Sequence, residues 1–108
     1  MTTQEIALMI ESVGVPYAYY QFPEGTEQAP PFICFYYPRS DDFYADSANY
    51  KKISELTVEL YTDVRDFALE AALEQALEAC GLSYTWEETF IDSEKMHLTV
   101  YTTEVING

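Results

Sequence analysis

The feature that most constrains the fold is a change of hydrophobic period between residues 53 and 81. Leu56, Val58 and Leu60 alternate with polar residues, a pattern typical of a strand with one buried face. Asp63 and Asp66 then indicate the start of a helix, and Gly81 indicates its end. Between them, apolar residues recur at helical spacing: Leu69, Leu73, Ala76, Leu77 and Cys80. The sequence therefore predicts a strand that leads into an amphipathic helix.

Another helix is predicted at the start of the chain. Thr2 and Glu5 have the spacing of a capping box. The apolar stripe that follows consists of Ile6, Met9, Ile10 and Val13. Gly14 and Pro16 end this helix at the expected offsets.

The remaining periodic segments predict strands. Aromatic and β-branched residues indicate strands at 15–22 and 32–37, with a weaker one at 43–49. Near the end of the chain, one strand face is expected to hold Leu82, Tyr84, Trp86 and Phe90. After a turn at 91–94, the last strand is expected to bury Met96, Leu98 and Val100, opposite Lys95, His97, Thr99 and Tyr101. These two neighbouring strands are expected to form a hairpin.

These elements predict one α+β domain that spans residues 1–108. Both helices have a single apolar face, so we expect them to pack on one face of one mainly antiparallel sheet. The other sheet face, rich in Tyr and Thr, would be left for water or for neighbouring subunits.

The charge of the chain limits its partners. It has 19 Asp and Glu against five Lys and Arg, a formal net charge of -14 at pH 7. Direct binding to nucleic-acid phosphates is disfavoured, because such contacts depend on cationic side chains. Three roles stay open: solvation, attraction to a basic protein, or a wall past which DNA moves without binding.

The cysteines and the hydropathy of the sequence indicate the cellular environment in which the protein is expected. Cys34 and Cys80 are too few for a disulfide scaffold, and both lie in apolar patterns that predict free buried thiols. The sequence shows no signal segment and no apolar run of membrane-spanning length. We expect a reducing, cytoplasm-like environment and no membrane association.

No set of residues is suited to catalysis. His97 is the only histidine, and no second His or nearby Cys accompanies it to bind a metal ion. The four glycines are scattered, which excludes a glycine-rich phosphate loop, and no serine lies in a Gly-x-Ser-x-Gly setting. We therefore predict no catalytic residue, no metal, no cofactor and no enzyme activity.

Three acids recur every four residues in the second helix, at Glu70, Glu74 and Glu78. Like charges at this spacing mildly destabilise a helix. One interpretation is a solvated outer face. The alternative is an edge that docks on a basic surface or repels DNA.

The order and composition of seven segments match those of a known protein family. These segments are Thr2-Thr3-Gln4-Glu5-Ile6, Gly14-Val15-Pro16, the Tyr-rich strand with Phe22, Ala29-Pro30-Pro31-Phe32-Ile33, Asp41-Asp42-Phe43-Tyr44-Ala45-Asp46, Glu59-Leu60-Tyr61-Thr62-Asp63 and Trp86-Glu87-Glu88-Thr89. Over nearly its full length the chain resembles the small tail-completion or tail-terminator proteins of long-tailed bacteriophages and prophages. These are often labelled minor capsid proteins.

The resemblance implies an α+β subunit that assembles as a hexameric ring on the head-proximal end of the tail tube. There the ring stops tube growth and offers a surface to the connector proteins of the filled head. DNA leaves through its channel without specific binding. The implied location is the virion, after assembly in the host cytoplasm. Whether the ring forms in solution or only on the tube stays open.

Contacts with neighbouring subunits or with the tube are expected in the loops 23–31 and 41–49, which lack periodicity, and along the acidic helix edge. The residues concerned are Pro23, Glu24, Glu27, Pro30, Pro31, Asp41, Asp42, Phe43, Tyr44, Asp46, Glu70, Glu74 and Glu78. Two other functions stay open. One is an acidic inhibitor that mimics DNA in the basic groove of a nucleic-acid-binding protein, and the other is a connector or stopper on the head side of the neck.

Overall fold

A computed structural model describes residues 1–23, 28–40, 43–45 and 48–106, and of residues 43–45 and 48–51 it describes the backbone alone. The elements, in chain order, are α1 (Thr3–Glu11), β1 (Tyr17–Tyr19), β2 (Phe32–Tyr36), β3 (Phe43–Ala45), β4 (Ala48–Lys51), β5 (Ile53–Thr62), α2 (Phe67–Ala79), β6 (Tyr84–Ile91) and β7 (Met96–Ile106). In this part of the chain no helix has the length and apolar character needed to span a membrane.

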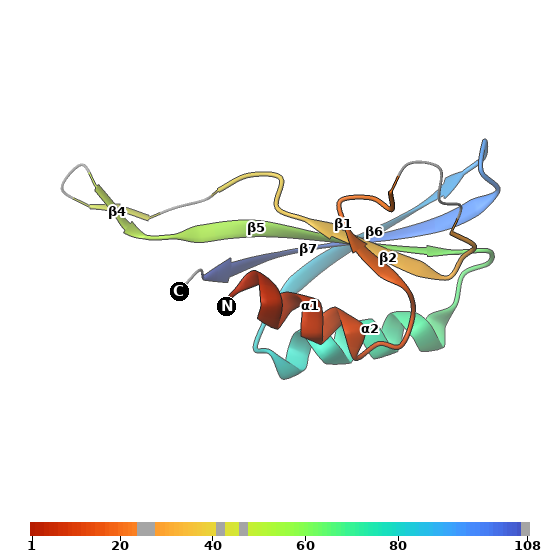
Figure 1. Cartoon of the computed structure of the whole chain (residues 1–108), viewed down its shortest axis with the longest axis horizontal. Helices are drawn as coiled ribbons and strands as arrows, with labels where there is room; N and C mark the ends of the chain where they lie inside the picture. Colours follow the sequence, from red (N-terminus) through yellow and green to blue (C-terminus); the bar gives the residue numbers. More distant parts are fainter. Residues whose placement is uncertain (24–27, 41–42, 46–47, 107–108) are drawn as a thin grey trace.

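Five strands form one sheet in the order β1-β2-β5-β7-β6. The β1–β2 pair is parallel and the other three pairs are antiparallel. Both helices lie on the same face of this sheet (Figure 1). Tyr20 and Phe22, which follow β1, pack on the opposite face against Tyr36 and Phe32. The predicted α+β fold, a mainly antiparallel sheet with two helices on one face, is therefore confirmed.

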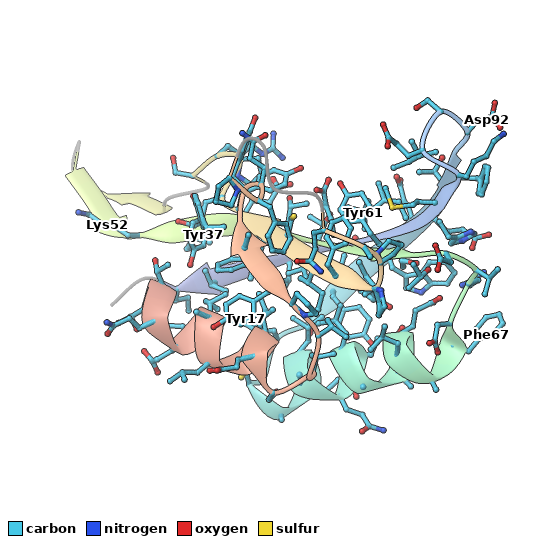
Figure 2. The ribbon with its side chains drawn as sticks, turned by 45° about the vertical axis from the view of Figure 1, so that its right-hand side comes forward. Tyr17, Tyr37, Lys52, Tyr61, Phe67 and Asp92 are labelled. Carbon is cyan, nitrogen blue, oxygen red and sulfur yellow. The ribbon has the colours of Figure 1, made fainter. Side chains whose placement is uncertain are left out.

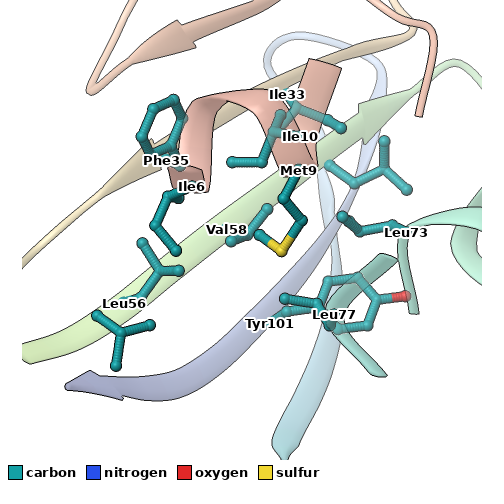
Figure 3. Close-up of a cluster of buried hydrophobic side chains, with 12 residues drawn as sticks. Ile6, Met9, Ile10, Ile33, Phe35, Leu56, Val58, Leu73, Leu77 and Tyr101 are labelled. Atoms are coloured by element: carbon teal, nitrogen blue, oxygen red, sulfur yellow. The ribbon is translucent and has the colours of Figure 1, made fainter. Parts of the chain in front are cut away.

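The core fills the space between the helices and the sheet (Figure 3). Ile6 and Ile10 of α1 and Leu73 and Leu77 of α2 are fully buried, and they pack in one cluster with sheet residues such as Val58. Burial of an aliphatic side chain of this size contributes about 1.5–3 kcal/mol. The helices are thus held to the sheet by the apolar stripes that the sequence predicts.

The predicted helix ends are also confirmed. The Thr2 hydroxyl accepts a bond from the Glu5 N–H at 3.2 Å, and the Glu5 carboxylate accepts one from the Thr2 N–H at 2.9 Å. Asp66 caps α2 by accepting from the Leu69 N–H at 3.0 Å. Gly14 and Gly81 follow the two helices with φ of 93° and 74°, a conformation that favours glycine.

Two strand predictions differ from the structure. The strand expected at 15–22 is limited to Tyr17–Tyr19, because Tyr20 has a φ of 69° and turns the chain away. The weak strand expected at 43–49 is instead the antiparallel hairpin of β3 and β4, which forms a sheet of its own. This hairpin projects at one end of the long axis of the molecule (Figure 1).

The face assignment of the last strand was wrong. Val58 pairs with Tyr101, so the residues of β7 that point to the helices are His97, Thr99, Tyr101, Thr103 and Val105. Leu98 and Val100, which we expected in the core, are half-buried on the opposite face. The reason is that Tyr101 buries its ring and still finds a partner for its hydroxyl, an option that a count of apolar residues does not reveal.

The packing of α2 makes a first prediction. Leu77→Ala removes a fully buried side chain, and we expect it to lower the free energy of unfolding by about 2–5 kcal/mol. The matched control is Leu8→Ala in α1, where the side chain is 64% exposed, with an expected change within about 0.5 kcal/mol. Urea denaturation followed by circular dichroism measures both, and equal losses would contradict this packing.

Candidate functional site

The start of α2 and the edge strand β6 bring the rings of Phe67 and Trp86 to Arg65. The exposed Val64 and Phe90 belong to the same two segments of the chain, and these five residues are here called the aromatic corner. Val64 and Phe67 flank the Asp66 cap of α2, while Trp86 and Phe90 point to the same face of β6. Their exposed fractions are 76% and 68% for the first two and 49% and 51% for the strand residues. Large exposed apolar side chains on neighbouring elements are typical of surfaces that bind other molecules.

Arg65 lies at the centre of the aromatic corner. Its guanidinium carbon is 4.6 Å from the centroid of the Phe67 ring and 5.2 Å from that of Trp86, both within cation–π range. The same group bonds to the carboxylate of Glu70 through Nε at 3.1 Å and Nη2 at 3.2 Å, and Nη1 lies 2.7 Å from Glu88 Oε2. These bonds, led by the one to Glu70, raise the Arg65 pKa. Arg65 is therefore held in place by four neighbours.

His97 joins this network. Its Nε2 lies 2.8 Å from Glu88 Oε2, the same oxygen that contacts Arg65. The sequence placed His97 on the more polar strand face, but it points to the helix side of the sheet, where its ring contacts Glu88. Within residues 1–23, 28–40, 43–45 and 48–106 no three His, Cys, Asp or Glu side chains are grouped so that they could hold a metal ion.

Of the three acids of α2, Glu70 is buried, Glu74 is half-buried and Glu78 is exposed. Glu70 is 5% exposed and is bonded to Arg65. Glu74 accepts from the Tyr101 hydroxyl at 2.7 Å and from Tyr84 at 3.4 Å, and Glu78 accepts from Tyr84 at 3.3 Å. The interpretation of these three acids as a fully solvated edge is therefore wrong for Glu70. The signal was present, because Glu70 and Glu74 share the helical stripe of Leu73 and Leu77.

The sheet face opposite the helices is partly covered by its own chain. Phe32 stacks on Tyr61 with ring centroids 4.6 Å apart, and Phe22 meets Phe32 edge-on at 5.4 Å. Cys34 is buried on this face, and burial raises the pKa of its thiol to about 11. Cys80, also predicted to be buried, is exposed because it caps the end of α2. Both thiols are free, as predicted.

A shallow depression of about 530 Å³ lies beside the start of β6. Its ionisable lining residues are Arg39, Glu55 and Glu104, together with Tyr84. Arg39 forms a bond to Glu55 at 2.6 Å. Threonines 85, 102 and 103 supply much of the remaining wall. This lining, which also includes Ser83, offers a polar surface.

The structure separates the predicted contact loops. Pro23, Pro30 and Pro31 belong to the β1–β2 connection, and Phe43 and Tyr44 lie in β3, at the projecting end (Figure 1). Five other predicted contact residues lie outside the described residues, namely Glu24, Glu27, Asp41, Asp42 and Asp46. The aromatic corner was missed, although Trp86 and Phe90 were predicted to share a strand face. The sequence does not indicate this cluster, because Arg65 and Phe67 come close to Trp86 only in the folded chain.

Tyrosine hydroxyls bonded to carboxylates give a prediction about pH. Burial, followed by nearby carboxylates, raises the pKa values of Tyr61 and Tyr101 above the usual value of about 10. The folded state therefore holds these protons where the unfolded state releases them, so the associated stability is present below pH ~10 and lost as the pH rises further. We expect the urea midpoint to fall above pH ~10 and the slope to lessen in Tyr101→Phe. A midpoint constant over that range would contradict these bonds.

Comparison with known proteins shows a likeness of fold. No protein-family model and no curated protein matches the sequence. Among solved structures, a chain described as "Virion of native gene transfer agent (GTA) particle" has a similar fold, with a TM-score of 0.61 over 96% of this chain and 90% of that chain. The two sequences are 15% identical. At this identity the likeness establishes a common fold alone.

Proposed function

We propose that this protein is a structural subunit of a phage or phage-like particle, and that it caps the head-proximal end of the tail tube. The observation that carries the proposal is the fold likeness to a virion chain over 96% of the present chain. The resemblance of the sequence to tail-terminator proteins points to the same class. Under this proposal the protein stops tube growth and offers a surface for joining to the head.

The surface chemistry suits a protein that acts by adhesion. The aromatic corner combines Trp86, Phe67 and Arg65, residue types that are enriched at the energetic centres of protein interfaces. Arg65 is fixed by ion pairs, so little side-chain entropy is lost when a partner binds. These features support binding to proteins, with tail-tube and connector proteins as the proposed partners.

The proposed assembly is a hexameric ring in the virion, with DNA passing through its channel. A formal charge of -14 on each subunit disfavours adhesion of DNA phosphates to the channel wall. The loops 23–31 and 41–49 are proposed contacts with neighbouring subunits or with the tube. Charge reversals in both loops that leave ring assembly and tail joining intact would count against these contacts.

Two alternative functions are a DNA mimic and a connector or stopper on the head side of the neck, and the structure bears on the first of them. A DNA mimic would present acids outward in place of phosphates, yet Glu70 and Glu74 are turned inward and bonded to Arg65 and to tyrosines. This arrangement argues against the mimic. A connector or stopper on the head side of the neck has the same general requirements as a tail cap, so binding to the tube end is the property that separates the two.

Tube capping is tested with purified tail-tube protein from the same phage or phage-like particle. The exposed thiol of Cys80 can carry a gold label while buried Cys34 is protected. We expect electron micrographs to show label at one end of each tube and tubes that stop lengthening once the protein is added. Label that is absent from tube ends, with growth unchanged, would overturn the proposed function.

Salt should favour self-association. Each copy has a formal charge of -14, and repulsion between copies is screened over about 8 Å at physiological ionic strength. We therefore expect the oligomer fraction, measured by sedimentation velocity, to increase with sodium chloride concentration. Oligomers that form best at low salt would contradict this expectation.

A further inference from the structure

A depression of about 380 Å³ lies on the sheet face opposite the helices, where the β1–β2 connection meets β2 and β5. Tyr61, which forms part of its wall, lies on the side of the sheet away from the helices (Figure 2). The lining residues that the structure describes are Tyr20, Gln21, Phe22, Gln28, Phe32, Cys34 and Tyr61, of which four are aromatic. Contacts between rings hold this wall, because Tyr20 packs on Tyr36 with centroids 5.5 Å apart and Phe22 packs on Phe32 at 5.4 Å. The depression is therefore a hollow whose aromatic wall is already formed.

The carboxylate of Glu59 lies beside the floor of this depression. Glu59 pairs with Cys34 in the register of β2 and β5, so both side chains point to the face opposite the helices. Its Oε1 accepts a hydrogen bond from the Tyr61 hydroxyl at 3.0 Å, and its Oε2 accepts one from the Tyr36 hydroxyl at 3.3 Å. Burial is the main cause that raises the pKa of the Cys34 thiol, and the charge of Glu59 is the second. The negative charge of Glu59 therefore acts on a residue that lines the depression.

Glu59 is half-buried and its hydrogen-bond partners are neutral. Among the described side chains it takes part in no ion pair, whereas Glu70, which is also removed from water, is paired with Arg65. Charges that leave water are usually paired in proteins. An ionised carboxylate offers about four acceptor sites, so acceptor capacity remains after the two tyrosine bonds. Within the described part of the chain, Glu59 thus supplies a negative charge without a counter-charge.

The combination of aromatic rings with one carboxylate suits a guanidinium group. Arginine can donate two parallel hydrogen bonds to a carboxylate, stacks on aromatic rings, and is more weakly hydrated than the ammonium group of lysine. Its aliphatic stem can lie along apolar surface while its charged head reaches the acid. A metal ion such as Ca²⁺ would need several oxygen ligands, and in the described part of the chain no three His, Cys, Asp or Glu side chains are grouped to hold one. The depression therefore fits an arginine side chain better than a metal ion.

The arginine is expected to come from a different protein. Three of the five Lys and Arg residues of this chain already form ion pairs with acids, namely Arg39 with Glu55, Arg65 with Glu70 and Lys95 with Asp92. A second copy would also bring a formal charge of -14 towards the carboxylate. A basic protein is instead attracted to this surface, because complementary charge favours its approach.

We propose that the depression beside Glu59 binds an arginine side chain that projects from a different, basic protein. The guanidinium group pairs with the Glu59 carboxylate, and the aliphatic stem lies against the aromatic wall. This inference rests on the proposed function for the identity of the partner, which would be another protein of the particle. The site itself needs no particle, so a peptide can test it.

The test uses two short peptides that differ in one charge. One is a blocked glycine-arginine-glycine peptide, and the other has citrulline, an uncharged analogue of similar shape, in place of arginine. Each peptide is titrated into the isotope-labelled full chain, and binding is followed by NMR. We expect the arginine peptide to shift the backbone amide signals of Cys34, Glu59 and Tyr61. The citrulline peptide should bind at least about ten-fold more weakly, because it cannot form charge-assisted bonds to the carboxylate.

Two variants assign the binding to this site. Glu59→Gln keeps an acceptor for the tyrosine hydroxyls and removes the charge, so we expect the arginine peptide to bind at least about ten-fold more weakly. Tyr20→Ala removes an exposed ring of the wall, with binding expected to weaken about two- to five-fold. The matched control is Glu11→Gln, which removes the same charge from an exposed position of α1, on the other face of the sheet (Figure 1). It should bind the peptide like the wild type.

Four results would overturn the site: no binding of the arginine peptide up to its solubility limit, equal affinity for the two peptides, equal weakening by Glu59→Gln and Glu11→Gln, or shifts confined to residues outside the depression. The tube experiment separates this inference from the proposed function. Tube capping by a protein that fails these peptide tests would reject the arginine site and keep the function. Arginine binding at Glu59 by a protein that does not cap tubes would keep the site and reject the function.

Discussion

Tyr101 lies between β7 and α2 with its ring fully buried and its hydroxyl 2.7 Å from Glu74. This contact fixes which face of β7 meets the helices, and it fixes the rotation of α2 about its axis. With that rotation set, Glu70 one turn earlier points to Arg65, and Arg65 in turn lies against the rings of Phe67 and Trp86. The exposed aromatic corner is thus a consequence of how a buried hydroxyl is satisfied.

The inner stripe of α2 mixes apolar and acidic residues, and each type has a separate effect. Leu73 and Leu77 supply burial, which holds the helix to the sheet without specifying direction. Glu70 and Glu74 require donors with defined positions, because a buried carboxylate without a partner is costly. We infer that the acids select one placement of the helix among those that the leucines alone would allow.

Sequence reasoning captured what depends on local periodicity and local hydrogen bonds. The capping box of Thr2 and Glu5, the cap at Asp66, the long strand β5 and the final hairpin were all predicted correctly. Each is decided by residues within a few positions of one another. The two helices on one sheet face followed from their single apolar stripes.

Predictions failed where distant residues decide. Thr99 and Thr103 point to the core because β7 pairs with β5 in a register that places Tyr101 beside Val58, and the sequence of β7 alone does not contain that pairing. The burial of Glu70 was not predicted, because its ion-pair partner Arg65 precedes the helix. The position of Arg65 depends on the turn between β5 and α2, which the helical pattern does not describe. The strand expected at 43–49 reverses direction, since it forms two short strands.

The asymmetry of the molecule bears on what kind of assembly it can form. A strongly acidic chain that associated through one self-complementary patch would bring its own charges together, and for β6 this places Glu87 against Glu88. A contact between two different surfaces, as in a ring, avoids that cost, because no surface then faces its own copy. In this molecule Lys52 lies at one end and Phe67 and Asp92 lie at the other (Figure 2), so the two ends differ in composition, and the angle between successive copies would determine how many complete a ring.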